Sequence, residues 1–147
     1  MNPQAIQLNL VSRDRDSVLH ELVQLVPGLQ KRPNEATRLL EGLIEREEMH
    51  STGIGDGLAL PHTRNNVGGL VMEPLIVFGR HAKGIDYGAI DSKPVQLFFL
   101  LLTTSITQHL HVLARMSRIL RNPELRSSLL IVKSPADAIH EMQRWEG

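Results

Sequence analysis

The chain is best interpreted from one stretch, Ser51-Thr52-Gly53-Ile54-Gly55-Asp56-Gly57-Leu58-Ala59-Leu60-Pro61-His62. Its three glycines occupy alternate positions, where they permit unusual backbone torsions and let main-chain N–H groups face an anion. The apolar residues 58–60 predict a short buried strand, and Pro61 fixes the backbone before His62. By itself, this pattern also fits a tight turn followed by a core histidine.

The full string closely resembles the active-site segment of a known family. This family comprises the enzyme IIA domains of the fructose, mannitol and nitrogen-regulatory type in the bacterial phosphoenolpyruvate-dependent phosphotransferase system. In that family the histidine that ends the motif is phosphorylated on its distal nitrogen, and the resemblance assigns this role to His62. The usual motif has Ile where this chain has Leu58 and Leu60, which keeps the strand apolar.

The segment from His109 to Ala114 resembles the second signature of the family, whose first histidine approaches the phosphorylated one. Helical spacing separates His109 from His111, because residues two apart point about 200° away from each other. His111 shares a face with two arginines, so we expect His109 to point inward and His111 outward. The inward, apolar stripe consists of Ile106, Leu113, Met116 and Leu120. Without the resemblance, a hydrogen-bonded core histidine is the ordinary interpretation of His109.

An arginine within Glu45-Arg46-Glu47-Glu48 is ordinarily a solvated surface charge. The family carries an Arg-Glu pair at the helix end before the glycine loop, and Arg46-Glu47 matches it. A guanidinium there can donate two parallel hydrogen bonds to phosphoryl oxygens. Arg64 is a weaker alternative for this role. Further phosphoryl-binding groups are predicted among the loop hydroxyls and amides, at Ser51, Thr52, Gly53 and Gly55.

Composition narrows the class of protein. The 147 residues include 16 Lys plus Arg, 16 Asp plus Glu and no cysteine. This balance predicts no nucleic-acid or membrane-surface partner, and the lack of cysteine excludes disulfides and thiolate metal sites. No apolar run approaches the roughly 20 residues that span a bilayer, so we expect a cytoplasmic protein with no membrane insertion. The length fits one EIIA type-2 domain over 1–147.

Apolar periodicity predicts an α/β fold: a single domain in which helices flank both sides of a central mixed sheet of about five strands. The resemblance implies the same fold. Strands are expected at 6–11, 58–60, 75–78 and 95–102. Helices are expected after an N-cap at Ser12, after an N-cap at Asn34, over 106–121, after Asn122-Pro123 and after Ser134-Pro135 as far as Trp145.

The sequence lacks the residue patterns of two other kinds of site, a metal site and a nucleotide-binding loop. A metal site would draw on His50, His62, His109 and His111, but neither His-x-x-x-His nor His-Glu-x-x-His occurs, so no metal or other cofactor is expected. A nucleotide loop would need the glycine-lysine-hydroxyl ending of a P-loop, which Gly53–Gly57 lacks.

The resemblance implies a phosphocarrier that accepts a phosphoryl group from a histidine phosphocarrier protein of the HPr or NPr kind. We expect that protein to dock on an apolar surface around the His62 loop, where Ile54 or Leu70 is exposed. The resemblance leaves open whether the phosphoryl group then serves to regulate a target protein or passes to a IIB domain of a sugar transporter. A third alternative is that the protein is a binding module that is not phosphorylated at all. The segment 89–95 and the unfused domain favour the nitrogen-regulatory subgroup, whereas Tyr87-Gly88 departs from the expected Phe-Asp.

Overall fold

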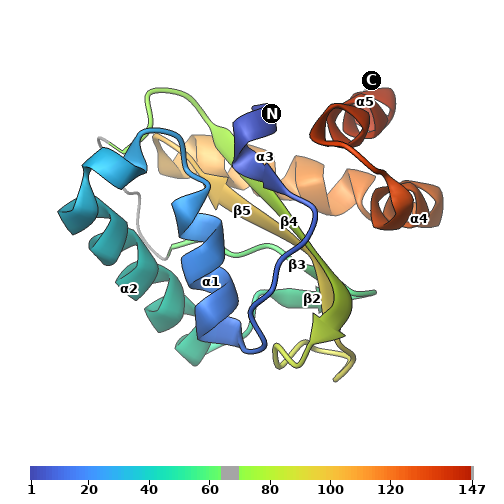
Figure 1. Ribbon diagram of the computed structural model, residues 1–147, viewed down its shortest axis with the longest axis horizontal. Coiled ribbons are helices and arrows are strands. Elements are labelled where there is room, and N and C mark those ends of the chain that lie inside the picture. Colours follow the sequence, from blue (N-terminus) through green and yellow to red (C-terminus); the bar gives the residue numbers. More distant parts are fainter. Residues whose placement is uncertain (64–69, 147) are drawn as a thin grey trace.

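The computed structural model describes residues 1–63 and 70–146 and consists of a five-stranded sheet between two layers of helices (Figure 1). The strands are β1 (Ile6–Gln7), β2 (Gly53–Gly55), β3 (Leu58–Ala59), β4 (Leu75–Ile85) and β5 (Val95–Leu102). The helices are α1 (Arg15–Gln24), α2 (Pro33–Met49), α3 (Ile106–Ile119), α4 (Pro123–Ile131) and α5 (Pro135–Glu146), with 3-10 turns η1 (Pro3–Ala5) and η2 (Leu29–Lys31). The sheet order is β1-β4-β5-β3-β2, and it is mixed, since β1–β4 and β3–β5 are parallel pairs and the others antiparallel.

The central strand β5 shows why helices cover both faces of the sheet. Its alternate residues Phe98, Leu100 and Leu102 pack into a cluster with α1 and α2. Leu97, Phe99 and Leu101 pack into a second cluster with α3, α4 and α5. In Figure 1, α1 and α2 accordingly lie on one side of the sheet and α3 on the other. The predicted fold class, with a mixed sheet flanked on both sides, is confirmed.

Strand lengths differ from the prediction at two places. The strand expected at 6–11 pairs as a strand only over Ile6–Gln7, because the chain then leaves the regular ladder and returns with one bond, from the Leu10 amide to the Arg80 carbonyl at 2.9 Å. Strand β4 continues seven residues past Phe78 to Ile85. Polar residues interrupt the apolar run there, although the backbone still pairs with β5 as far as Ile85 opposite Val95.

Both N-cap predictions for the first two long helices are wrong. Asp14, not Ser12, caps α1, and its carboxylate accepts the Ser17 amide at 2.9 Å. Helix α2 begins at Pro33 with Arg32 as its N-cap and no side-chain capping bond. Proline suits a first helical position because its φ is already helical and it has no N–H to satisfy.

Three elements meet at one edge of the sheet. Strands β3 and β5 run parallel with Leu58 opposite Leu97, so their carboxyl ends lie together. Strand β3 leads to His62, and β5 leads to Ser105, whose hydroxyl caps α3 by accepting the Gln108 amide at 3.1 Å. The carboxyl end of α2 comes to the same place through the turn that precedes β2.

Candidate functional site

The ring of His62 is oriented by the strand that precedes it. Pro61 is buried, and its carbonyl accepts the Leu101 amide at 3.0 Å, which extends the pairing with β5 beyond Ala59. His62 is half-buried, and its Nδ1 lies 2.7 Å from the carbonyl oxygen of Leu60. Because a carbonyl oxygen only accepts, Nδ1 carries the proton and Nε2 keeps its lone pair. In the neutral ring, the local fold therefore favours the tautomer that has a proton on Nδ1 and a lone pair on Nε2.

A second imidazole stands directly beside the first. The ring centroids of His62 and His109 are 4.8 Å apart, and the ring planes are inclined at 46°. His109 is half-buried in the first turn of α3 and His111 is exposed, as predicted from helical spacing. The predicted stripe is wrong at Ile106, which is 72% exposed, because α3 is buried only further along, at Met116 and Ile119.

Burial and positive charge act on both rings in the same direction. Burial lowers the pKa of His62 most, the Leu60 carbonyl opposes this, and His109 and Arg46 lower it further. The pKa of His109 is lowered by burial and then by the charge of Arg46. A lowered pKa keeps an imidazole neutral, and hence nucleophilic or able to donate from N–H, at physiological pH.

Arg46 lies near both rings at the end of α2. It is half-buried, and its Nη1 donates to the carbonyl of His50, one turn further along the chain. This bond holds the guanidinium against the carbonyl of His50, the residue directly before Ser51. The alternative candidate, Arg64, lies outside the described residues.

The glycine loop is a tight hairpin between β2 and β3. Gly55, Asp56 and Gly57 have φ of 94°, 57° and 77°, so the turn needs left-handed backbone that glycine adopts without strain. Ile54 projects from it and is 45% exposed, whereas Leu70, the other residue expected at the surface, is half-buried against the core.

Both loop hydroxyls have partners within the protein. The Ser51 hydroxyl donates to the Tyr87 carbonyl at 3.3 Å and accepts the Gly53 amide at 3.0 Å. The Thr52 hydroxyl is buried and donates to the carboxylate of Glu47. In this state, therefore, neither hydroxyl proton points freely toward the imidazoles.

The segment from Asp86 to Asp91 forms hydrogen bonds with the glycine loop and packs closely against it. Ile90 donates its amide to the Gly53 carbonyl at 3.2 Å, and the Asp91 carboxylate accepts the Asp56 amide at 3.1 Å. A Cβ on Gly53 would stand 2.8 Å from the Cβ of Ala89, so glycine is required there for close approach. No sequence pattern pairs these two segments, which lie more than thirty residues apart.

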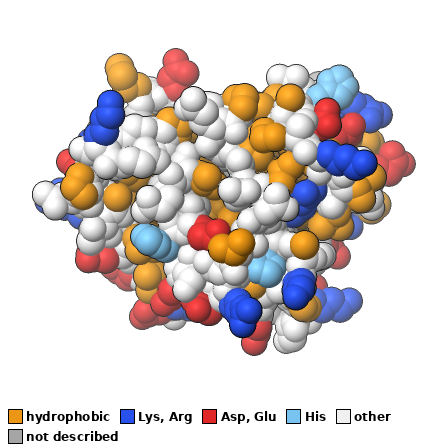
Figure 2. Space-filling model, viewed as in Figure 1, with side chains coloured by type: hydrophobic (Ala, Val, Ile, Leu, Met, Phe, Trp, Pro, Cys, Tyr) orange, Lys and Arg blue, Asp and Glu red, His pale blue; other side chains and the backbone are white. Residues whose placement is uncertain are grey.

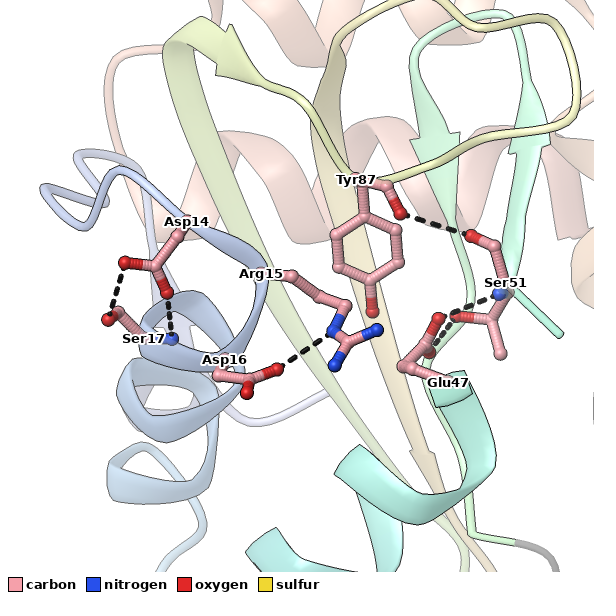
Figure 3. Close-up of polar contacts among 8 residues, drawn as sticks. Asp14, Arg15, Asp16, Ser17, Glu47, Ser51 and Tyr87 are labelled. Carbon is pink, nitrogen blue, oxygen red and sulfur yellow. Dashed lines mark hydrogen bonds and ion pairs between the residues drawn. The ribbon is translucent and has the colours of Figure 1, made fainter. Parts of the chain in front are cut away.

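Behind the loop, Ser51 and Thr52 contact Glu47 and Tyr87, two residues to which the sequence analysis gave no role (Figure 3). Glu47 is 4% exposed, and its Oε1 accepts the Thr52 amide at 2.8 Å. The Tyr87 side chain points between Arg15 and Glu47. Burial, and then the charge of Glu47, raise the pKa of Tyr87 well above its usual value. The only signal for these contacts in the sequence is the Arg-Glu pair itself.

Acidic and basic side chains both occur around the edge of the face seen in Figure 2, as the zero net charge leads one to expect. Within residues 1–63 and 70–146, no three histidine or acidic side chains are grouped so that they could hold a metal ion. No helix in the same ranges is long and apolar enough to cross a membrane.

The sequence of this chain matches a family model over residues 1–144, and the description of that model is phosphoenolpyruvate-dependent sugar phosphotransferase system, EIIA 2. The chain belongs to this EIIA family. The glycine loop, His62 and His109 of this EIIA chain all lie within the matched residues.

One relative and two solved structures describe the similarity. The fructose-specific EIIABC component of Bacillus subtilis is 36% identical over 136 residues, 91% of this chain. The EIIA chain spans only 21% of the length of that relative. The nitrogen regulatory protein IIA-Ntr of Neisseria meningitidis is 27% identical with a TM-score of 0.81, covering 99% of this chain and 95% of that one. The IIA mannitol enzyme of Escherichia coli, solved in complex with phosphorylated IIB mannitol, shares the fold at 14% identity and a TM-score of 0.81, covering 98% and 97%.

Proposed function

We propose that this EIIA chain is a phosphocarrier in which Nε2 of His62 accepts a phosphoryl group from a histidine phosphocarrier protein of the HPr or NPr kind. The observation that carries the proposal is the pairing of two imidazoles whose centroids lie 4.8 Å apart, one of them held with its Nδ1 on the Leu60 carbonyl. This leaves Nε2 of His62 as a neutral nucleophile that needs no separate base.

The transfer exchanges one phosphorus–nitrogen bond for another. The P–N bond of the donor phosphohistidine breaks as a P–N bond to Nε2 of His62 forms, and the donor imidazole keeps the electron pair of the broken bond. No oxidation, water or cofactor takes part. Passing the group on repeats the same exchange with His62 as the leaving imidazole. Such transfers depend on alignment and charge stabilisation rather than on covalent help from other groups.

The neighbouring groups stabilise charge on the moving phosphoryl group. Arg46 supplies a fixed positive charge that already acts on both imidazoles, and His109 supplies an N–H donor beside His62. We keep Ser51, Thr52, Gly53 and Gly55 in the phosphoryl-binding loop. The two hydroxyls are held by Tyr87 and Glu47, so their proposed part is to fix the shape of the loop.

For the destination of the phosphoryl group, we propose a regulatory target protein in the cytoplasm. The support is the similarity to IIA-Ntr, which extends over 95% of that chain. The second candidate is a IIB domain of a sugar transporter. EIIA domains do partner with IIB domains, as in the mannitol complex, and the fructose-specific relative supports this acceptor. We further propose that residues 1–147 form a single EIIA domain.

A phosphorylation assay tests the proposal. The protein is incubated with phosphoenolpyruvate, the general first enzyme and the histidine carrier, and its intact mass is measured. We expect one acid-labile phosphoryl group in the wild type and in His111→Ala, whose ring is exposed, and none in His62→Ala. If the wild type stays unphosphorylated by active donors, the phosphocarrier proposal fails and the binding module takes its place.

A further inference from the structure

A continuous series of hydrogen bonds leads from a buried carboxylate to the His62 ring. Oε1 of Glu47 accepts the Thr52 amide at 2.8 Å, and Oε2 accepts the Thr52 hydroxyl. The carbonyl of Thr52 then accepts the Leu60 amide at 3.1 Å. The carbonyl of Leu60 in turn accepts Nδ1–H of His62 at 2.7 Å. Two residues, Thr52 and Leu60, thus connect Glu47 with the ring.

The environment of Glu47 makes its position well defined. The side chain is 4% exposed and Thr52 is also 4% exposed, so water does not compete for these bonds. A buried carboxylate with two donors from a single residue fixes that residue in both translation and rotation. The Tyr87 side chain points between Arg15 and this carboxylate, and among the described residues its own hydroxyl has no hydrogen-bond partner.

Helix α2 also connects Glu47 with a residue that acts on the two imidazoles. Glu47 directly follows Arg46, whose charge acts on both imidazoles. Arg46 therefore places a positive charge near the two imidazoles, while the next residue, Glu47, places a carboxylate against Thr52. A shift of Glu47 would move the Thr52 backbone, and through it the Leu60 carbonyl that selects the tautomer of His62.

We propose that Glu47 is a positioning residue that holds His62 in the Nδ1–H tautomer by way of Thr52 and Leu60. It touches neither His62 nor a transferred group. The role deepens the proposed function, because it explains how a residue behind the loop determines which nitrogen of His62 is free to react. Its first part, the selection of a tautomer, holds whether or not the ring is phosphorylated.

Nitrogen-15 NMR of the imidazoles in Glu47→Gln, with Glu48→Gln as matched control, tests this role. Glutamine has nearly the shape of glutamate, but it lacks the charge and offers one acceptor atom in place of two. The Thr52 hydroxyl therefore loses its acceptor and must turn to accept a weaker, uncharged bond from the glutamine N–H. Glu48 is exposed on the same helical turn and undergoes the same chemical change. We expect one Nδ1–H tautomer of His62 in the wild type and in Glu48→Gln, and a mixture with the Nε2–H form in Glu47→Gln.

The rate of phosphoryl transfer is the second readout. A slight displacement of a reacting group can cost up to about a hundredfold in rate, so we expect a drop of roughly ten- to a hundredfold in Glu47→Gln and none in Glu48→Gln. Thermal unfolding of each variant establishes that it is folded at the assay temperature. If Glu47→Gln does not fold, Thr52→Val removes the hydroxyl bond alone and carries the same expectation for the tautomer.

The outcomes separate this inference from the proposed function. A folded variant with the His62 tautomer of the wild type overturns the positioning role, whatever its transfer rate. A changed tautomer in Glu47→Gln together with a wild type that accepts no phosphoryl group upholds the positioning role and overturns the phosphocarrier.

Discussion

The two ring nitrogens of His62 lie in different surroundings, and this difference gives the residue its chemistry. Nδ1 is committed to the Leu60 carbonyl at 2.7 Å, which leaves the lone pair of the neutral ring on Nε2. Burial and the positive charge of Arg46 lower the pKa of the ring. The same two causes lower the pKa of His109, which favours two neutral imidazoles at physiological pH over an imidazole beside an imidazolium.

The proposed role of His109 predicts that its removal slows the transfer without preventing it. In His109→Ala, His62 keeps its nucleophilic nitrogen and should still accept a phosphoryl group. Because one charge-stabilising donor is lost, the transfer should slow by roughly a hundredfold or more. Quenched-flow transfer from the phosphorylated carrier measures the rate. His111→Ala is the control, since that ring is exposed two residues away. Equal rates for both variants would mean that His109 is an ordinary core histidine with no role in the transfer.

Residues of the site differ in how far the sequence reveals them. His62, His109 and Arg46 fall in motifs that resemble a family, and the structure brings all three together. Glu47 and Tyr87 were given no part in the site, because their importance comes from a buried contact across 40 residues of chain. Hydrogen bonds to a main chain leave no periodic pattern in a sequence, so the Thr52 anchor could be found only in three dimensions.

At the scale of elements, local chemistry predicts some boundaries and tertiary pairing determines others. Strand β5 has the predicted bounds because a proline precedes it and hydroxyl residues follow it. Strand β4 is longer than predicted, because β4 and β5 shift register after Arg80 and pair again at Ile85, beyond a polar segment that is not covered on both faces. Asp14 caps α1 although Ser12 is also a capping residue type, because the backbone at Ser12 is engaged by the Glu21 carboxylate at 2.7 Å.

Two helix caps provide a matched pair for testing how α3 positions His109. Ser105 caps α3 at the site, and Asn122 caps α4, where its side chain accepts the Glu124 amide at 2.8 Å. Replacing either residue with Ala should lower the free energy of unfolding by about 0.5–2 kcal/mol, because one helix N–H loses its partner. Only Ser105→Ala should also slow phosphoryl transfer.

Urea denaturation measures the stability loss in both cap variants, and the transfer assay gives the rates. A similar fall in rate for Asn122→Ala would show that transfer responds to global stability. In that case the α3 cap would have no separate influence on His109.

At the scale of the whole molecule, the fold was predictable because apolar residues fill two continuous layers. Strand β5 contributes alternate side chains to each of them. The ring stack of Phe78 and Phe99, with centroids 4.7 Å apart, joins two strands within the second layer. The order of the strands was not predictable. Strand β3 pairs in parallel with β5, although β4 comes between them in the sequence.

The lowered pKa values of His62 and His109 predict how global stability depends on pH. Below the ordinary histidine pKa of about 6.5, the unfolded chain binds protons that the two half-buried rings in the folded chain do not. Stability from these rings is therefore fully present above that pH and is lost as the pH falls through the folded-state values. Urea unfolding at several pH values between 8 and 5 measures this loss. The slope should be smaller in a His62→Gln, His109→Gln double variant, and an unchanged slope would mean that other groups account for it.

Arg46 and Glu47 are consecutive residues that act on opposite sides of the glycine loop, and this has a consequence for how the family can vary in length. Each residue in an α-helix advances the side chain by about 100°. Inserting or deleting one residue within α2 would therefore turn both side chains away from their partners at once. We expect insertions and deletions among relatives to lie before Pro33 or after the loop, while the number of residues from Pro33 to His62 stays constant.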